Sequence, residues 1–321
     1  MKTLLSMFKN RESRFGSFSS PFRRYPGDEK GRFRYALFHF LCQAGLVRTW
    51  QFCMQRYRPS IVLYHDPDPV LFAAHLDELK KHFNLISLRD YIEARHSNTL
   101  HLLPKYPLII TIDDGLAGNF QLLEVIKKRK VPVTIFLTSG IVDTMRHFWW
   151  TPLKSEEDFR KMKKKRNQEL ASELSRFDFS KEASHASRQA LTAQEIRKMK
   201  PYIDFQAHTR FHPVLPMCTE EEAYDEICVC KTELETRFAL DIYALAYPHG
   251  DYSDRDVELA KQAGYRCALT VDGGLNGKRT DLFRLKRIYM PDDAVPMEAV
   301  TKASGLWTAL TWPFKRTGPK Y

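Results

Sequence analysis

Short apolar runs alternate along the chain with stretches in which apolar residues recur every three to four positions. The runs are rich in β-branched residues and predict buried strands over residues 60–65, 108–115, 133–139, 204–209, 242–250, 267–274 and 285–291. The periodic stretches predict helices over residues 72–83, 121–130, 191–200, 219–238, 253–265 and 298–310. Thr192 and Glu195 also have the spacing of a capping box, which marks a helix start. Repeated strand–helix units predict an α/β protein, and about seven strands favour a closed or partly closed barrel over an open sheet.

Two segments depart from this alternation. Residues 156–188 are rich in charged residues and Ser and lack a strand signal, so we expect a helical insertion over about 146–190. Residues 1–58 precede the first strand, and their apolar patch at 36–47 predicts either an interfacial amphipathic helix or a helix packed on the barrel. The expected organisation is an N-terminal extension over 1–58, a barrel over 59–310 and a tail over 311–321.

Charge is concentrated at the N-terminus of this 321-residue chain, whose net charge is +11. Residues 1–60 hold twelve Lys and Arg against Glu12, Asp28 and Glu29. Such a basic arm predicts a solvated tail or peripheral contact with an anionic membrane. No nucleic-acid-binding module is recognisable, so we expect no specific nucleic-acid partner.

The cysteine pattern and hydropathy bear on location. The six cysteines form no CxxC pair, which argues against a disulfide framework or a zinc–thiolate site. The chain has no run of about 18 apolar residues, so we expect no membrane-spanning helix. No segment has the layout of a signal peptide. We therefore expect a cytoplasmic protein, held peripherally at the inner face of the membrane if the basic arm binds lipid.

Polar residues of the kinds that carry chemistry stand at the ends of four predicted strands. These residues are His65, Asp113, Asp114, His208, His212 and His249. In a parallel barrel the carboxyl ends of the strands share one rim, where active sites form. We therefore expect these side chains to converge.

Two pairs suggest a metal site. Asp113 and Asp114 are adjacent, so one carboxylate can bind a metal while the other faces a substrate; the alternative is a helix N-cap. His208 and His212 lie four residues apart, close enough to reach one ion, or they are simply two loop histidines. Two His and one Asp form a common open coordination set for a catalytic divalent metal.

Three segments resemble the motifs of the polysaccharide deacetylases, the NodB-homology group also called carbohydrate esterase family four. TIDDG (111–115) is similar to the family's TFDDG motif, and AHTRFHPVL (207–215) is similar to its second, His-Ser/Thr-x-x-His motif. AYPHGDYS (246–253) resembles a Tyr-Pro-Tyr-Gly version of the third motif. The resemblance runs from about Ile61 to about Leu310. It implies a distorted (β/α)7 barrel and a divalent metal ion: Zn²⁺, with Co²⁺, Ni²⁺ or Mn²⁺ as alternatives.

The resemblance implies a role for each matching residue. Asp113 would be the base that activates a metal-bound water, and the metal ligands would be Asp114, His208 and His212. The oxyanion and substrate would meet the Tyr247-Pro248-His249 segment, with the His249 N–H as the oxyanion donor. His65 would protonate the leaving amine, as in the circularly permuted subgroup that acts on exopolysaccharides; the alternative is a buried, hydrogen-bonded His.

The chain departs from the family pattern at several positions. Ala246 stands where an Arg usually supports the base, and Arg287, in the last strand, could supply that charge. His249 replaces a common aromatic residue and is a competing acid. The segment HFWWTPL (147–153) resembles a Trp-Trp segment of cell-envelope members, so Trp149 and Trp150 either line a sugar groove or pack the insertion onto the barrel.

The function implied is hydrolysis of acetyl groups from N-acetylated amino sugars of a polysaccharide or glycolipid. Two alternatives stay open. An O-acetyl carbohydrate esterase would use the same site, because an ester needs no strong acid for its leaving group. A carbohydrate-binding protein without activity would keep the fold without needing the base and the ligands.

Overall fold

A computed structural model describes residues 29–311, with side chains described from Phe33 onward. In this range an eight-stranded parallel sheet forms the centre of the molecule. Seven strands lie in the order β7 (Cys267–Leu269), β6 (Ala244–Ala246), β5 (Asp204–Ala207), β4 (Val133–Leu137), β3 (Pro107–Ile112), β1 (Ser60–Tyr64) and β8 (Ile288–Tyr289). The eighth, β2 (Asn84–Leu85), pairs with the start of β3.

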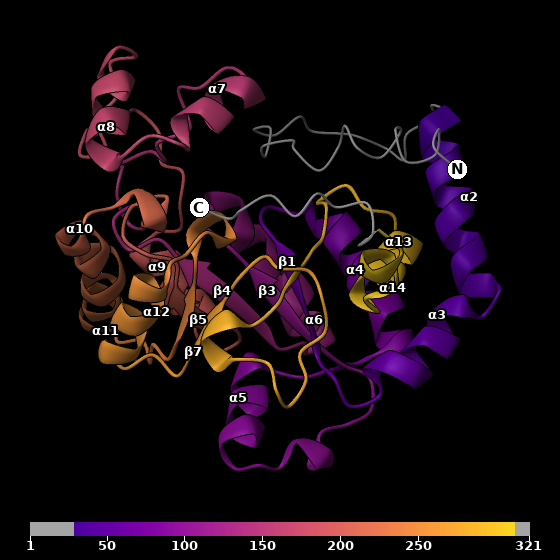
Figure 1. Cartoon of the computed structure of the whole chain (residues 1–321). Helices are drawn as coiled ribbons and strands as arrows, with labels where there is room; N and C mark the ends of the chain where they lie inside the picture. Colours follow the sequence, from indigo (N-terminus) through magenta and orange to yellow (C-terminus); the bar gives the residue numbers. More distant parts are fainter. Residues whose placement is uncertain (1–28, 312–321) are drawn as a thin grey trace.

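The sheet curls so that its two ends approach each other. β8 pairs with β1 through Val62 and Ile288, and a parallel bridge joins Leu269 of β7 to Leu285, just before β8. The predicted fold is confirmed as a distorted (β/α) barrel, with the first and last strands adjacent (Figure 1).

Both faces of the strands are buried, which explains their continuous apolar runs. Ile61, Ile109 and Phe136 belong to the apolar cluster inside the barrel. The alternate residues, such as Val62 and Ile110, pack against the surrounding helices.

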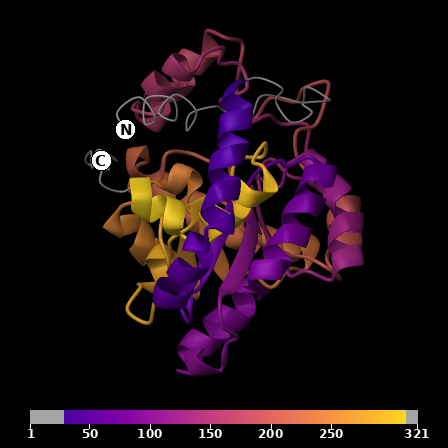
Figure 2. The same cartoon turned by 90° about the vertical axis from the view of Figure 1, so that its right-hand side faces the viewer.

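Helices cover the outside of the sheet (Figures 1 and 2). They are α4 (Pro69–His82), α6 (Leu123–Arg129), α9 (Ala193–Met199), α10 (Glu220–Tyr224), α11 (Cys230–Phe238), α12 (Asp254–Gln262), α13 (Pro296–Ala303) and α14 (Leu306–Thr311). α5 (Leu88–His96) instead lies at the end of the barrel where the strands begin, and its Leu88, Tyr91 and Ile92 join the cluster inside the barrel. The π-helical turn η5 (Asp225–Val229) joins α10 to α11. Thr192 and Glu195 form the expected capping box of α9. Gly305, with φ of 81°, divides the last predicted helix into α13 and α14.

The segment after β4 contains two short helices, α7 (Glu156–Met162) and α8 (Asn167–Ser175), which project above the barrel in Figure 1. They have a small core of their own, which is formed by Trp149, Phe159, Met162, Leu170, Leu174 and Phe179. Trp149 joins the insertion to the barrel, because its indole also donates to the carbonyl oxygen of His212 at 2.9 Å.

The N-terminal segment forms α2 (Glu29–Gln43), α3 (Leu46–Trp50) and the π-helical turn η1 (Gln51–Gln55). α2 packs against the C-terminal helices: Arg34 lies 2.5 Å from Glu298, and the rings of Phe38 and Trp307 are 5.0 Å apart. Residues 1–28 of the predicted extension, and 312–321 of the predicted tail, lie outside the described residues. Among residues 29–311, no helix combines the length and apolar character needed to cross a bilayer.

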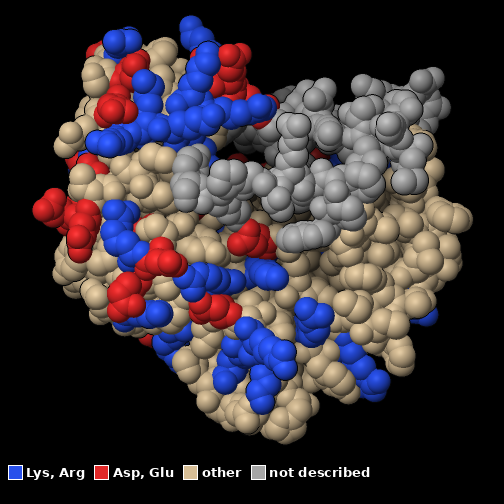
Figure 3. Space-filling model, viewed as in Figure 1, with Lys and Arg blue, Asp and Glu red and all other residues tan. Residues whose placement is uncertain are grey.

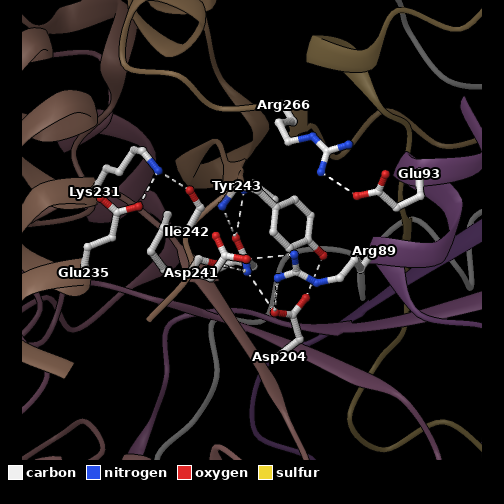
Figure 4. Close-up of polar contacts among 11 residues, drawn as sticks. Arg89, Glu93, Asp204, Lys231, Glu235, Asp241, Ile242, Tyr243 and Arg266 are labelled. Carbon is white, nitrogen blue, oxygen red and sulfur yellow. Dashed lines mark hydrogen bonds and ion pairs between the residues drawn. The ribbon is translucent and has the colours of Figure 1, made fainter. Parts of the chain in front are cut away.

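A polar network closes the end of the barrel at which the strands begin (Figure 4). The Tyr243 hydroxyl donates to Asp204 at 2.6 Å, and the guanidinium of Arg89 lies 4.2 Å from the centre of the Tyr243 ring. Arg266 pairs with Glu93 at 2.6 Å. These contacts tie α5 to the start of β5, β6 and β7. This end of a barrel contributes stability and not chemistry.

Candidate active site

The predicted site residues meet at the opposite end, where the strands finish. Several strands, such as β3, β5 and β6, end before the residues predicted as their ends, and the chain then turns through left-handed conformations. φ is 72° at Asp114, 57° at His212 and 58° at His249. Such conformations are uncommon in non-glycine residues and concentrate at functional sites.

The three predicted ligands come together in a buried cluster. Oδ1 of Asp114 lies 3.4 Å from Nε2 of His208 and 3.4 Å from Nε2 of His212. One ligand atom from each residue lies within 4.8 Å of the others. Asp114 Oδ1 is buried and has no hydrogen-bond partner. An orphaned carboxylate oxygen facing two imidazole nitrogens fits a divalent cation.

Neighbouring groups orient the two histidines. Nδ1 of His208 donates to the carbonyl oxygen of Ala246 at 2.8 Å, so in the neutral imidazole Nε2 is the free nitrogen and faces the cluster. The His212 loop is held by Glu226, whose carboxylate accepts from the N–H groups of Arg210 and Phe211, both at 2.8 Å. The Trp149 indole donates to the carbonyl oxygen of His212 at 2.9 Å. Glu226 was not predicted from the sequence, because an acid in an acid-rich helix gives no signal of this contact.

The electrostatics suit a ligand set that must lose its protons. Burial and the neighbouring His208 lower the pKa of His212 to about 3, so its imidazole is neutral. Burial raises the pKa of the Asp114 carboxyl, but its two histidine partners outweigh this effect and hold the pKa below its ordinary value. Burial opposes a charge on His208, yet Asp113 and Asp114 raise the pKa of its imidazole. A proton therefore competes with a cation mainly at His208.

Asp113 is paired with Arg287, the residue expected to replace the missing arginine of the third motif. The guanidinium donates to both carboxylate oxygens, at 2.7 and 2.8 Å, and both side chains are buried. A third bond, from Nε to the carbonyl oxygen of Thr270 at 2.9 Å, fixes the arginine. Burial raises the pKa of Asp113, but the charges of Arg287 and His208 outweigh it and keep the pKa below its ordinary value.

Replacing Arg287 by Met is expected to lower the free energy of unfolding by about 3–5 kcal/mol, because it leaves the buried Asp113 carboxylate without its partner. The pH dependence of the stability that Asp113 contributes should also change sign. In the wild type the lowered pKa of Asp113 contributes stability that is lost as pH falls through it. In Arg287→Met burial dominates and raises that pKa, so stability is lost as pH rises through it.

Urea unfolding of Arg287→Met, Asp113→Asn and the double variant over a pH series measures this coupling. The double variant should lose less stability than the sum of the two single variants. Additive losses, or an unchanged pH dependence, would contradict the pairing.

His65 follows β1, is half-buried, and lies close enough to Asp113 and Asp114 to lower the pKa of both carboxyl groups. Its ring centroid is 5.9 Å from that of Tyr289 in β8, as expected for adjacent first and last strands. Its backbone is held by Asn119, which donates to the His65 carbonyl at 2.8 Å, and by the Asp292 carboxylate, 3.4 Å from the His65 N–H. Burial and Asp292 raise the pKa of the neighbouring Asp66 to about 6. Sequence reasoning missed both acids around this histidine.

The remaining predicted residues lie in three different settings. His249 stands over the cluster, with its ring centroid 4.5 Å from that of His212. Trp150 is half-buried, and its ring lies 4.6 Å from that of His212, while Trp149 packs on Phe159 in the insertion. The structure therefore brings Trp150 to the site and gives Trp149 a packing and supporting position.

The side chain of Tyr247 does not point into the cluster. The ring is buried against Tyr252, and the hydroxyl donates to the carbonyl oxygen of Phe283 at 3.2 Å. Pro248 is buried and begins the short turn that presents His249. The expected substrate contacts of this segment are therefore limited to its backbone and to His249.

The sequence model of the polysaccharide deacetylase family matches residues 103–268. This span includes Asp113, Asp114, His208, His212 and His249 but neither His65 nor Arg287. Among curated proteins, YxkH of Bacillus subtilis is 21% identical over 183 residues, which are 56% of this chain and 50% of that protein. The chain thus spans about half the length of this relative.

Solved structures share the fold at low identity. The Streptococcus pyogenes deacetylase PplD, in complex with acetate, has a TM-score of 0.58 and 19% identity, over 77% of this chain and 98% of its own. IcaB from Ammonifex degensii has a TM-score of 0.56 and 16% identity, and the match covers 77% of this chain and 97% of IcaB. The BpsB deacetylase domain from Bordetella bronchiseptica has a TM-score of 0.52 and 14% identity, over 73% and 96%.

Proposed function

The chain belongs to the polysaccharide deacetylase family, whose model matches more than half of it, and we propose that it hydrolyses the acetamide groups of N-acetylated amino sugars in a polysaccharide or glycolipid. The observation that carries the proposal is the buried Asp114–His208–His212 cluster beside the Arg287-paired Asp113. This arrangement places a cation site and an ionised carboxylate on one rim.

The cluster would hold the cation. A divalent ion bound by Asp114, His208 and His212 would lower the pKa of the attacking water towards neutrality and polarise the acetyl oxygen. Two imidazole nitrogens and one carboxylate oxygen suit Zn²⁺, and Co²⁺, Ni²⁺ or Mn²⁺ are alternatives.

Asp113 is the proposed base. It is ionised at neutral pH despite its burial, because Arg287 and His208 hold its pKa below the ordinary value. Its Oδ2 lies 3.7 Å from Nε2 of His208, so the carboxylate faces the ligand cluster. It takes the proton of the attacking water, and the bidentate bond to Arg287 keeps it oriented for that transfer.

The leaving amine needs a proton, because an amide anion is a very poor leaving group. His65 donates this proton from the end of β1, and the backbone N–H of His249 stabilises the negative charge that develops on the acetyl oxygen when water attacks the acetyl carbon. Trp150, whose ring lies 4.6 Å from that of His212, packs against the sugar ring.

Metal content tests the ligand assignment. The wild type should bind one equivalent of Zn²⁺ by elemental analysis, and Asp114→Ala, His208→Ala and His212→Ala should each bind much less, because three protein ligands leave none to spare. Asp113→Asn is the matched control and should keep its metal. Full occupancy in the three ligand variants would refute the assignment.

Glu226→Ala is expected to weaken Zn²⁺ binding about 10- to 100-fold, because it frees the Arg210 and Phe211 amides that hold the His212 loop. Competition with a fluorescent chelator measures the affinity. Glu221→Ala, at an exposed position of the same helical segment, should leave the affinity unchanged. Equal affinities in the two variants would show that Glu226 does not position the loop.

A further inference from the structure

The outer face of the N-terminal helices exposes an unusual number of large apolar side chains. In α2, Phe33, Ala36 and Phe40 lie three and four residues apart and are exposed. Exposed large apolar side chains continue through α3 and η1 to Tyr57. We call these residues the aromatic face; they are Phe33, Tyr35, Phe40, Leu46, Phe52, Met54 and Tyr57. These seven are a large share of the sixteen exposed large apolar residues in the described part of the chain.

The opposite side of these helices is fixed to the barrel. Phe38, Leu41 and Val47 are buried, and the Trp50 indole donates to the carbonyl oxygen of Ser304 at 3.0 Å. The aromatic face is therefore held outward by a well-packed element. Figure 2 shows α2 running across the side of the molecule that faces the viewer.

The segment that forms this face carries charges of one sign. No Asp or Glu occurs from Phe33 to His65, whereas Arg48 and Arg58 are exposed. The Arg56 guanidinium lies 5.4 Å from the Phe52 ring and 5.3 Å from the Tyr57 ring. The sequence before Phe33 adds eight basic and only three acidic residues. In Figure 3 the right-hand side, over α3 and α14, is formed almost entirely by uncharged residues.

We propose that the aromatic face binds the surface of an anionic phospholipid bilayer. Aromatic and aliphatic side chains enter the boundary between headgroups and acyl chains, while arginines beside them meet lipid phosphates. A second copy of the chain fits less well, because a two-fold contact would bring two basic faces together. This proposal favours a location at the inner face of the cell membrane.

The position of α2 relative to the site links membrane binding to access of a glycolipid substrate. α2 runs along the flank of the barrel, and its N-terminal end lies on the side from which α7 and α8 project (Figure 1). A protein held by this flank would have its rim near the membrane, where a glycolipid would present its sugar. The binding itself does not depend on the proposed deacetylase activity.

Flotation of the purified full chain with vesicles tests the proposal. The protein should float with phosphatidylcholine–phosphatidylglycerol vesicles and not with phosphatidylcholine alone. About 1 M NaCl, at which the Debye length is about 3 Å, should weaken the binding.

Phe40 and Phe52 are 62% and 60% exposed, so Phe40→Ala with Phe52→Ala should keep the fold and lower vesicle affinity about tenfold or more. Leu102→Ala with Tyr224→Ala, also exposed but elsewhere, is the matched control.

A second readout uses Cys53, the exposed cysteine between Phe52 and Met54. A polarity-sensitive fluorophore at Cys53 should shift to the blue with the anionic vesicles alone. Asp113→Asn should float like the wild type, which separates this proposal from the catalytic one. Equal binding to both kinds of vesicle, no binding to either, full binding by the double variant, or a change only in oligomeric state would overturn it.

Discussion

Asp113→Asn is expected to lower acetate release from an N-acetylhexosamine oligomer by about 10²–10⁴-fold while leaving Zn²⁺ stoichiometry unchanged. The substitution removes the carboxylate that accepts the proton but none of the three ligand atoms. The neutral amide can still accept a hydrogen bond from Arg287, so the fold around it should survive. Single-turnover assays with equal amounts of metal-loaded protein measure the effect.

A surface carboxylate provides the control for this experiment. Asp77→Asn removes an exposed acid that pairs with Arg129, and it should leave turnover unchanged. If Asp113→Asn retained the wild-type rate with full metal occupancy, the base would have to be another residue. Loss of metal in the same variant would instead make Asp113 a ligand.

His65→Ala is expected to cost about 10²–10⁴-fold in rate on an N-acetyl substrate and much less on an activated acetyl ester. The amine must leave with a proton, whereas an activated alcohol departs without one. Activity against pH should be bell-shaped for the wild type, and the variant should lose the alkaline limb, which reports the acid. The acid limb should remain, since Asp113 is untouched.

His249→Ala is the matched comparison, because His249 is a second imidazole beside the cluster that is not a proposed ligand. It should keep the alkaline limb. If His249→Ala abolished that limb and His65→Ala preserved it, the two roles would have to be exchanged. Equal losses of His65→Ala on the ester and the amide would argue against an acid at His65 altogether.

The sequence predicted the elements of the barrel well because both faces of each strand are buried and the helices are amphipathic. It predicted strand ends poorly. The apolar run from Leu108 suggested a strand to Gly115, but β3 stops at Ile112. Asp114 then takes a positive φ, which few non-glycine residues adopt. Helix starts were easier, since a capping box such as Thr192–Glu195 is local in the sequence.

The site could be predicted where a motif or a strand end marked it. Arg287 was predicted because the base lacked its usual arginine and the last strand carried one, and the structure pairs it with Asp113. Glu226 and Asp292 were missed because each acts across a long chain separation through a backbone N–H. For residues 36–47 the sequence left an interfacial helix and a helix packed on the barrel open, because the periodicity does not say which side of a helix meets the barrel. In the structure one side of α2 packs on the barrel and the other exposes aromatic residues.

Acetate release with controlled metal content tests the central claim most directly. The protein would be stripped with a chelator, divided, and assayed on N-acetylhexosamine oligomers and lipid-linked glycans before and after Zn²⁺ is restored. We expect acetate and a free amine in equal amounts from at least one substrate, loss of release in the stripped protein, and recovery with Zn²⁺ in the wild type but not in His208→Ala. Release that persists in the stripped protein, or that His208→Ala recovers fully, would contradict a metal-dependent deacetylase at this site.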